Sequence, residues 1–593
     1  MTRFRRLLIY LATILAAWPG GRPLAQDVGY MVDIVGVEGD LAEQVREASI
    51  LVRLRDRPPG SMVALRRRAQ ADEERVMDVL RSNGFYAGEV EITLAETARP
   101  VPVTIAVSLG KPFVLGAFRV SSERPDPDAT PLVVGLESLG LELGRRAIAR
   151  EVVEAERRLL LELARRGYPL ARIVDRKAVA DFATHRLAVD VSVDTGPFAR
   201  FGRVEVAGLE DVAEAYVQRR LPWEQGDSFD SRDMEQARQE LVATGLFSSV
   251  RLSTGEAVEA GGLLPIRIEL RERPHRSIGG GVRYSTSQGP GVALFWEHRN
   301  LYGENEFFRV SAEYDSTVSA FNTTFRNPDF GGKDQDLVLS SRLREESTEA
   351  FDSTALSASA VMQWRLTETW RASAGLAAER SRQEEAGMRR NFTLVSIPGQ
   401  LYHDSTDDLL DPTRGGRLQL DVEPVLEALG SSLNFVRTEL ADSVYFQASE
   451  EPRVILAGWA RLGAIFGAQR QELPADRRFY AGGGGSVRGY GFQLAGPVNA
   501  EGDPIGGKSL LALGGEVRYR ATENIGVVGF LEGGNVYRDQ LPSLAEDLFW
   551  GAGLGFRYFT PIGPVRGDIA IPLRRRDDVD DPFQIYLSFG QAF

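Results

Sequence analysis

The strongest constraint on the fold is an alternation of apolar and polar residues that runs from about residue 275 to the end of the chain. In one extended segment, Ile278, Gly280, Val282 and Tyr284 share a face. The same period of two recurs in residues 308–314, 454–466, 550–558 and 583–593. A soluble β-sandwich shows a similar alternation, so the pattern predicts strands with one apolar face and leaves their environment open.

The first residues predict export. Arg3, Arg5 and Arg6 precede a short apolar run over residues 7–18, which is typical of a secretory signal, and residues 1–25 are the expected signal peptide. A short membrane anchor is the alternative. No other stretch is apolar over the roughly 20 residues that a membrane helix needs. An exported chain with aromatic-rich strands therefore favours a closed antiparallel transmembrane β-barrel over residues 274–593. At roughly twenty residues per strand and loop, the barrel has about sixteen strands.

Composition excludes several classes of function. The net charge of −13 and the pI near 5.2 argue against a nucleic-acid binder. The absence of cysteine excludes disulfides, thiolate catalysis and cysteine–zinc sites. The four histidines are scattered without metal-ligand spacing, and no nucleophile elbow or phosphate loop is present. We therefore expect no enzyme and no cofactor; a catalytic Ser/His/Asp group would have to be assembled in three dimensions.

The first part of the chain repeats at intervals of about eighty residues. Each unit has a helical pattern that stops at Gly84, Gly167 or Gly245, followed by an aromatic or apolar pair and an alternating strand. Glycine suits the left-handed position that ends a helix. The repeat predicts three β-α-α-β-β modules rather than one larger α/β domain, with boundaries at 28–110, 111–197 and 198–273.

The last strand also indicates closure. Phe583, Ile585, Leu587, Phe589 and Phe593 alternate with small or polar residues. A terminal strand with one apolar face needs partners on both edges, which a closed barrel provides. We interpret Phe589 and Phe593 as the terminal barrel signal.

Three later segments carry a family resemblance. They are Phe479–Tyr490, residues 551–570 with the pattern Gly-Pro-x-Arg-x-Asp, and Asp411-Pro-Thr-Arg-Gly-Gly416. Together they resemble the superfamily of outer-membrane assembly and two-partner secretion proteins, in which tandem POTRA modules precede a sixteen-stranded barrel. Three modules and a barrel of this size resemble the TamA family, the outer-membrane subunit of the translocation and assembly module.

The resemblance implies an assembly factor that inserts or secretes autotransporter-type and other outer-membrane proteins. The implied partners are outer-membrane lipids, unfolded outer-membrane protein clients and a TamB-like periplasmic protein anchored in the inner membrane; no stable homo-oligomer and no nucleic acid are implied. The modules would lie in the periplasm. The alternative function is a dedicated two-partner secretion pore for one exoprotein.

The resemblance also implies a locking loop, formed by Val487, Arg488, Gly489 and Tyr490, that folds into the barrel lumen. Its arginine pairs with a carboxylate on the inner wall in a planar fork that lysine matches poorly. The candidate carboxylates are, in order, Glu532, Glu516 and Asp568. Glu532 stands where the family more often has aspartate, and Asp568 has a structural alternative. Without the resemblance, the sequence favours the interpretation of Arg488 as a solvated charge in a flexible loop.

The last predicted feature is a weak seam. Gly279, Gly280 and Gly281 lie in the first barrel strand, and Gly590 lies in the closing strand. Glycines remove side-chain contacts between strands, so the two strands could part sideways and template an incoming strand. Glycines are also common in ordinary turns, which is the competing interpretation of this run.

Overall fold

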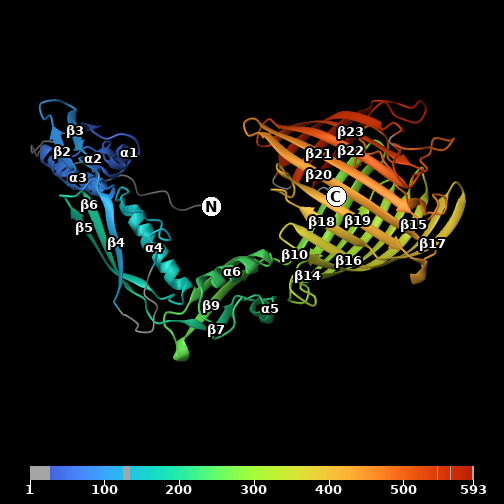
Figure 1. Ribbon diagram of the computed structural model, residues 1–593. Coiled ribbons are helices and arrows are strands. Elements are labelled where there is room, and N and C mark those ends of the chain that lie inside the picture. The colour runs from blue at the N-terminus through green and yellow to red at the C-terminus, as the bar shows by residue number, and fades with distance from the viewer. Residues whose placement is uncertain (1–26, 124–133, 544, 561–562, 591–593) are drawn as a thin grey trace, which may run out of the picture. The chain divides into compact units, whose positions relative to one another are not determined.

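The computed structural model describes residues 27–123, 134–543, 545–560 and 563–590 (Figure 1). The predicted signal peptide and Phe593 lie outside these ranges. The chain divides into two compact units. The first unit comprises the described residues up to Glu205 together with residues 221–237 and 252–268. The second unit comprises residues 206–220, residues 238–251 and the described residues from Glu269 onward. Among the described residues, no helix combines the length and the apolar composition needed to span a membrane.

Three small three-stranded sheets precede the barrel, each with its last strand in the centre: β1-β3-β2, β4-β6-β5 and β7-β9-β8. The first sheet is formed by β1 (Tyr30–Val35), β2 (Glu89–Leu94) and β3 (Val101–Ser108), with helices α1 (Gly39–Ala48), α2 (Ile50–Arg53) and α3 (Met62–Ser82). The second comprises β4 (Val114–Ser122), α4 (Ala149–Arg165), β5 (Arg172–Asp181) and β6 (Arg186–Asp194). The third comprises β7 (Arg200–Ala207), α5 (Glu214–Gln218), α6 (Ser231–Ala243), β8 (Phe247–Thr254) and β9 (Leu263–Glu272).

The predicted glycine stops are confirmed, because Gly84, Gly167 and Gly245 have φ angles of 85°, 92° and 73°. The described part of the second module has one helix, α4, where the repeat predicts two. Gly140 and Gly144, with φ angles of 70° and 88°, fall in the stretch of turns that precedes α4. Two left-handed glycines so close together do not fit a continuous helix.

Local sequence explains why α3 buries one face. Its buried residues recur at helical spacing, namely Leu65, Ala69, Asp72, Val76 and Leu80. The only charged residue among them, Asp72, accepts hydrogen bonds from Ser49 Oγ (2.6 Å) and from the backbone N–H groups of Ile50 and Leu51 (2.7 and 2.8 Å). Asp72 therefore caps the short helix α2 and holds it against α3.

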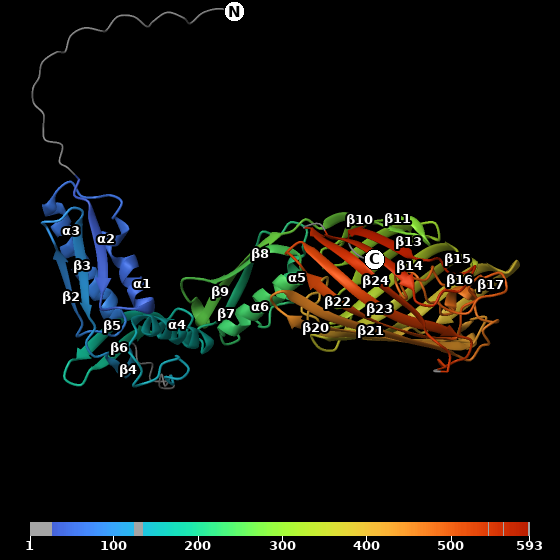
Figure 2. The same ribbon diagram turned by 90° about the horizontal axis from the view of Figure 1, so that it is seen from above.

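A closed antiparallel barrel follows, as predicted, and Figure 2 shows its tilted strands from above. Strands β17 and β18 both pair with β16 and form one barrel strand interrupted at Ile397-Pro398, where proline cannot donate to the ladder. Counted this way, the described residues give sixteen strands. Their bounds are β10 (Arg276–Ser285), β11 (Gly289–His298), β12 (Phe307–Tyr314), β13 (Val318–Asn327), β14 (Gln335–Ser347), β15 (Asp352–Arg365), β16 (Trp370–Glu385), β17 (Met388–Ser396), β18 (Gly399–Asp404), β19 (Gly415–Val425), β20 (Phe435–Ser449), β21 (Arg453–Phe466), β22 (Ser509–Arg520), β23 (Ile525–Tyr537), β24 (Phe549–Thr560), β25 (Gly563–Pro572) and β26 (Gln584–Gly590).

The alternation predicted from sequence is the alternation of the barrel wall. In β10, Ile278, Val282 and Tyr284 are exposed on the outside, with Ile278 83% exposed. Arg283, between Val282 and Tyr284, instead lines the internal cavity of the barrel. The apolar faces therefore meet lipid, and the charged faces meet the lumen.

Candidate functional site

The candidate site is the long loop between β21 and β22, residues 467–508, which packs inside the barrel. Phe479, Val487 and Tyr490 are buried in one cluster with residues of the wall strands such as Ile465 and Leu510. Phe479 and Tyr490 are buried, at 2% and 0% exposure. A loop with its own buried aromatic core is held in one place by packing.

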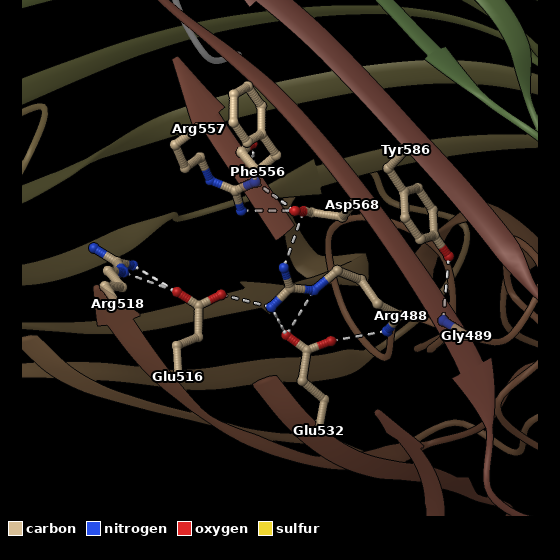
Figure 3. A network of polar contacts seen from close by, with 9 residues as sticks. All are labelled: Arg488, Gly489, Glu516, Arg518, Glu532, Phe556, Arg557, Asp568 and Tyr586. Atoms are coloured by element: carbon tan, nitrogen blue, oxygen red, sulfur yellow. Dashed lines mark hydrogen bonds and ion pairs between the residues drawn. The ribbon is translucent and has the colours of Figure 1, made fainter. Parts of the chain in front are cut away.

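Arg488 lies at the centre of a network with all three candidate carboxylates (Figure 3). Its Nε and Nη2 donate to Glu532 Oε1 (3.0 and 2.5 Å), and its backbone N–H donates to Glu532 Oε2 (2.8 Å). Nη2 also donates to Glu516 Oε1 (2.6 Å), and Nη1 donates to Asp568 Oδ2 (3.1 Å). The guanidinium lies 3.5 Å from the ring centroid of Phe530. Glu532 thus receives most of the bonds, while the other two carboxylates complete the fork.

The network continues beyond Arg488. Arg518 pairs with Glu516 at 2.9 Å, and Arg557 pairs with Asp568. The side chains of Arg488 and Glu532 are only 8% and 3% exposed. Buried charges of this kind are tolerated because each is paired and hydrogen-bonded.

Glycines on the wall let the loop approach closely. A Cβ on Gly551 of β24 would lie 1.9 Å from the carbonyl oxygen of Arg488, and a Cβ on Gly534 of β23 would lie 2.8 Å from Val487 Cγ2. Gly489 has a φ of 106°, and a Cβ there would meet Ile571 O at 2.7 Å. The backbone of the loop therefore lies directly against the sheet.

The loop also touches the closing strand. The hydroxyl of Tyr586, on β26, accepts from the N–H of Gly489 at 3.4 Å (Figure 3). The same hydroxyl donates to the carbonyl of Tyr490 at 3.3 Å. The Tyr490 hydroxyl in turn donates to the carbonyl of Arg574, between β25 and β26, at 2.9 Å. The locking segment and the seam strand are thus in direct contact.

A second anchor of the loop was not predicted from sequence. Arg478, whose side chain is 1% exposed, donates to both carboxylate oxygens of Glu385 on β16 (2.5 and 2.8 Å). Arg477 pairs with Glu379 of the same strand at 2.6 Å. The pair of adjacent arginines ahead of Phe479 was the available signal, but nothing in the sequence indicates that β16 lies opposite.

The predicted seam is the pairing of β10 with β26. In the described residues it runs from Gly281↔Gly590 to Ser285↔Tyr586, five positions, whereas β10 pairs with β11 at ten. Thr286 extends it with hydrogen bonds to Gln584 and Ile585. The glycines of β10 have a packing role as well. A Cβ on Gly279 would lie 2.3 Å from Phe295 of β11, and one on Gly280 would lie 2.6 Å from the carbonyl of Ala293.

A carboxylate staple precedes β10, within the second compact unit. Glu272 Oε1 accepts from the N–H groups of Glu210 (2.8 Å), Asp211 (3.2 Å) and Val212 (3.0 Å), and Oε2 pairs with His275 Nε2 (2.8 Å). Burial raises the pKa of Glu272, but these hydrogen bonds outweigh it and hold the pKa below its usual value. Asp211, Glu272 and His275 have metal-ligand chemistry and lie close together, but Glu272 is already saturated by protein donors.

Comparisons with known proteins agree with this architecture. Residues 300–593 match the Omp85 superfamily domain. The chain is 24% identical over 510 residues to the outer membrane protein assembly factor BamA of Nitratidesulfovibrio vulgaris, an alignment that covers 83% of this chain and 63% of that protein. It is 21% identical over 592 residues to BamA of Neisseria meningitidis serogroup B, and this alignment covers 88% of this chain and 72% of that protein.

Among solved structures, BamA from Haemophilus ducreyi lacking POTRA domains 1-3 has the same fold, with a TM-score of 0.70 at 18% identity. That likeness covers 80% of this chain and 99% of the other. The two sequence relatives and this fold together indicate that the barrel lies in the outer membrane and that the mixed α/β modules ahead of it are periplasmic.

Proposed function

We propose that the chain is a non-enzymatic assembly and translocation factor for outer-membrane proteins. The premise is that its barrel, over residues 300–593, matches the Omp85 superfamily domain. The observation that carries the proposal is the β10–β26 pairing, which spans five positions in the described residues, with the locking loop bonded to β26 through Tyr586. A strand edge that opens there offers unpaired N–H and C=O groups to an incoming strand.

The finer assignment is to a TamA-like role. Three mixed modules precede the barrel, and the proposed clients are autotransporter-type proteins together with other outer-membrane proteins. The proposed partner is a TamB-like periplasmic protein anchored in the inner membrane. The residues proposed to act are Arg488 with Glu532, Glu516 and Asp568 as the lock, and Gly279, Gly280, Gly281 and Gly590 at the seam.

The test of this role is a quantitative outer-membrane and secreted proteome, with the gene intact, deleted or carrying Arg488→Ala. Loss of several barrel or autotransporter proteins from the membrane in both mutants supports an assembly factor. Loss of one secreted protein, with the membrane proteome unchanged, would instead identify a dedicated two-partner secretion pore.

The seam itself can be tested by cross-linking, because the chain has no cysteine of its own. Tyr284 and Leu587 lie opposite each other across the seam and are both exposed on the outer face. A disulfide between Tyr284→Cys and Leu587→Cys should stop client assembly until it is reduced. The matched control joins Leu294→Cys and Ala312→Cys, opposite each other on β11 and β12, and should have no effect. Normal assembly by the cross-linked seam would rule out lateral opening.

A further inference from the structure

A row of arginines crosses the lumen wall beside the seam. The strand register places Arg520 opposite Gly526, Gly526 opposite Arg557, and Arg557 opposite Arg566. The register also places Arg566 opposite Ser588 and Ser588 opposite Arg283. The arginine row therefore consists of four arginines at one level on β22, β24, β25 and β10.

All four side chains line the same internal cavity, which has a volume of about 1340 Å³. The neighbours of Arg557 in β24, Phe556 and Tyr558, are exposed on the outer face at 49% and 43%. The sheet thus separates these arginines from any lipid headgroup in the surrounding bilayer. The cavity is larger than most small-molecule pockets and is reached through the lumen.

Three arginines of the row have acidic partners. Arg520 pairs with Asp411 at 2.8 Å, Arg283 pairs with Asp315, and Arg557 pairs with Asp568. The side chain of Arg566 makes no hydrogen bond or ion pair with any residue that the structure describes. It also stands directly opposite Arg557, and like charges in that position destabilise a sheet.

Because Arg566 has no acidic partner among the described residues, positive charges outnumber negative charges around the lock. Around the lock, the three carboxylates of Glu516, Glu532 and Asp568 face four guanidinium groups, those of Arg488, Arg518, Arg557 and Arg566. Asp568 already serves both Arg488 and Arg557. In a protein with a net charge of −13, this is a local excess of positive charge inside a cavity. An anion that enters the lumen would be attracted to it.

We propose that Arg566, together with Arg557 and Arg283, binds a carboxylate group of a polypeptide inside the lumen, next to the seam. Ser588 lies between Arg566 and Arg283 and adds a hydroxyl donor. Strands β25 and β10 are two spacings apart, about 10 Å, which two arginine side chains can bridge around one carboxylate. The identification of the ligand as a polypeptide rests on the proposed function. The existence of an anion site rests on the geometry of the arginine row alone.

The test uses the full chain in lipid nanodiscs and a fluorescent peptide with the sequence of residues 584–593. That segment has no acidic side chain, so its only carboxylate is the terminal one, and an amidated copy removes it. We expect the free acid to bind the wild-type chain about tenfold more tightly than the amide, the effect of one charge-assisted contact. Arg566→Gln should bring the two affinities together, and Arg566→Lys should give an intermediate ratio.

The matched control is Arg461→Gln, because Arg461 lines the same cavity but is paired with Glu439. It should keep the wild-type ratio of acid to amide binding. Heat-modifiable migration on a gel shows that each variant has folded. A ratio that persists in Arg566→Gln would overturn the proposal. Equal binding of both peptides, with Arg566-dependent binding of inorganic phosphate or of phosphatidylglycerol, would replace the polypeptide with a free anion or a lipid headgroup.

Client assembly by the same variants separates this site from the proposed function. Discrimination between acid and amide without any client assembly would keep the carboxylate site and remove the assembly role. Client assembly by the wild-type chain without such discrimination would keep the assembly role and remove the site.

Discussion

The wall around Arg488 and the β10–β26 seam belong to one barrel but are held together differently. On the wall, a buried guanidinium bonds to three carboxylates from β22, β23 and β25, and the loop lies directly against Gly551. At the seam, five described backbone positions and the contacts of Thr286 join the strands. We therefore predict that the lock holds the loop in the lumen and that the closing strands separate more easily than other neighbouring strands.

Removal of the lock should have the largest effect on stability. Arg488→Ala leaves Glu532 buried without its cation, and we expect a loss of about 3–5 kcal/mol in the free energy of unfolding. Urea unfolding in detergent, followed by tryptophan fluorescence, measures it. Arg461→Ala removes a more exposed pair, with 36% of the arginine accessible, and should cost about 1 kcal/mol or less. Equal losses in both variants would show that the lock is no stronger than an ordinary lumen pair.

Crowding the loop should have the next largest effect. In Gly551→Ala, the new methyl group would lie 1.9 Å from the Arg488 carbonyl, so the loop must shift, at a cost of about 1–3 kcal/mol. Gly515→Ala is the matched control, because the nearest atom to its Cβ is Ala457 O at 4.0 Å. Trypsin should cut the loop faster in Gly551→Ala alone. Unchanged cleavage would mean that the loop is not held against β24.

The seam should respond more weakly, by about 1 kcal/mol, when its terminal hydrogen bonds are removed. Thr286→Val loses the hydroxyl that donates to Gln584 and accepts from Ile585. Hydrogen exchange should quicken in β10 and β26 only. Thr323→Val, which removes a hydroxyl contact with Ser341 between β13 and β14, is the control. Faster exchange spread evenly around the barrel would contradict a distinct seam.

The smallest expected effect is a pH dependence of the staple ahead of β10. Because the folded state lowers the pKa of Glu272, its contribution to stability is present above the unfolded value of 4.5 and is lost as the pH falls through the folded value. Exchange of the amides of residues 210–212 should therefore quicken, beyond the intrinsic trend, as the pH drops below 4.5. Glu272→Gln should remove that dependence. A wild-type profile without such a change would show that the staple does not depend on the charge of Glu272.

Sequence reasoning reached the parts of this protein that depend on local periodicity. The period of two in residues 278–284 requires one lipid-facing side, and Gly84, Gly167 and Gly245 adopt the left-handed conformation expected of them. The choice of Arg488 and its three carboxylates came from the family resemblance, and the structure brings these four residues together. Their function as a lock stays a prediction until the variants are measured.

What the sequence could not supply is any contact that depends on which strands face each other. Arg477 and Arg478 pair with Glu379 and Glu385, which lie 98 and 93 residues away in the chain. The arginine row exists only because of the register between strands, since its members are scattered over more than 280 residues of chain.

By itself, then, the sequence determined the strand faces, the glycine stops of the modules and the closed form of the barrel, because backbone sterics and the need to satisfy polar groups act locally. Tertiary structure alone decided that Arg488 is shared among three carboxylates, that Tyr586 joins the loop to the seam and that Arg566 has no described acidic partner. These features depend on barrel closure and register, which bring distant side chains within a few ångströms of one another.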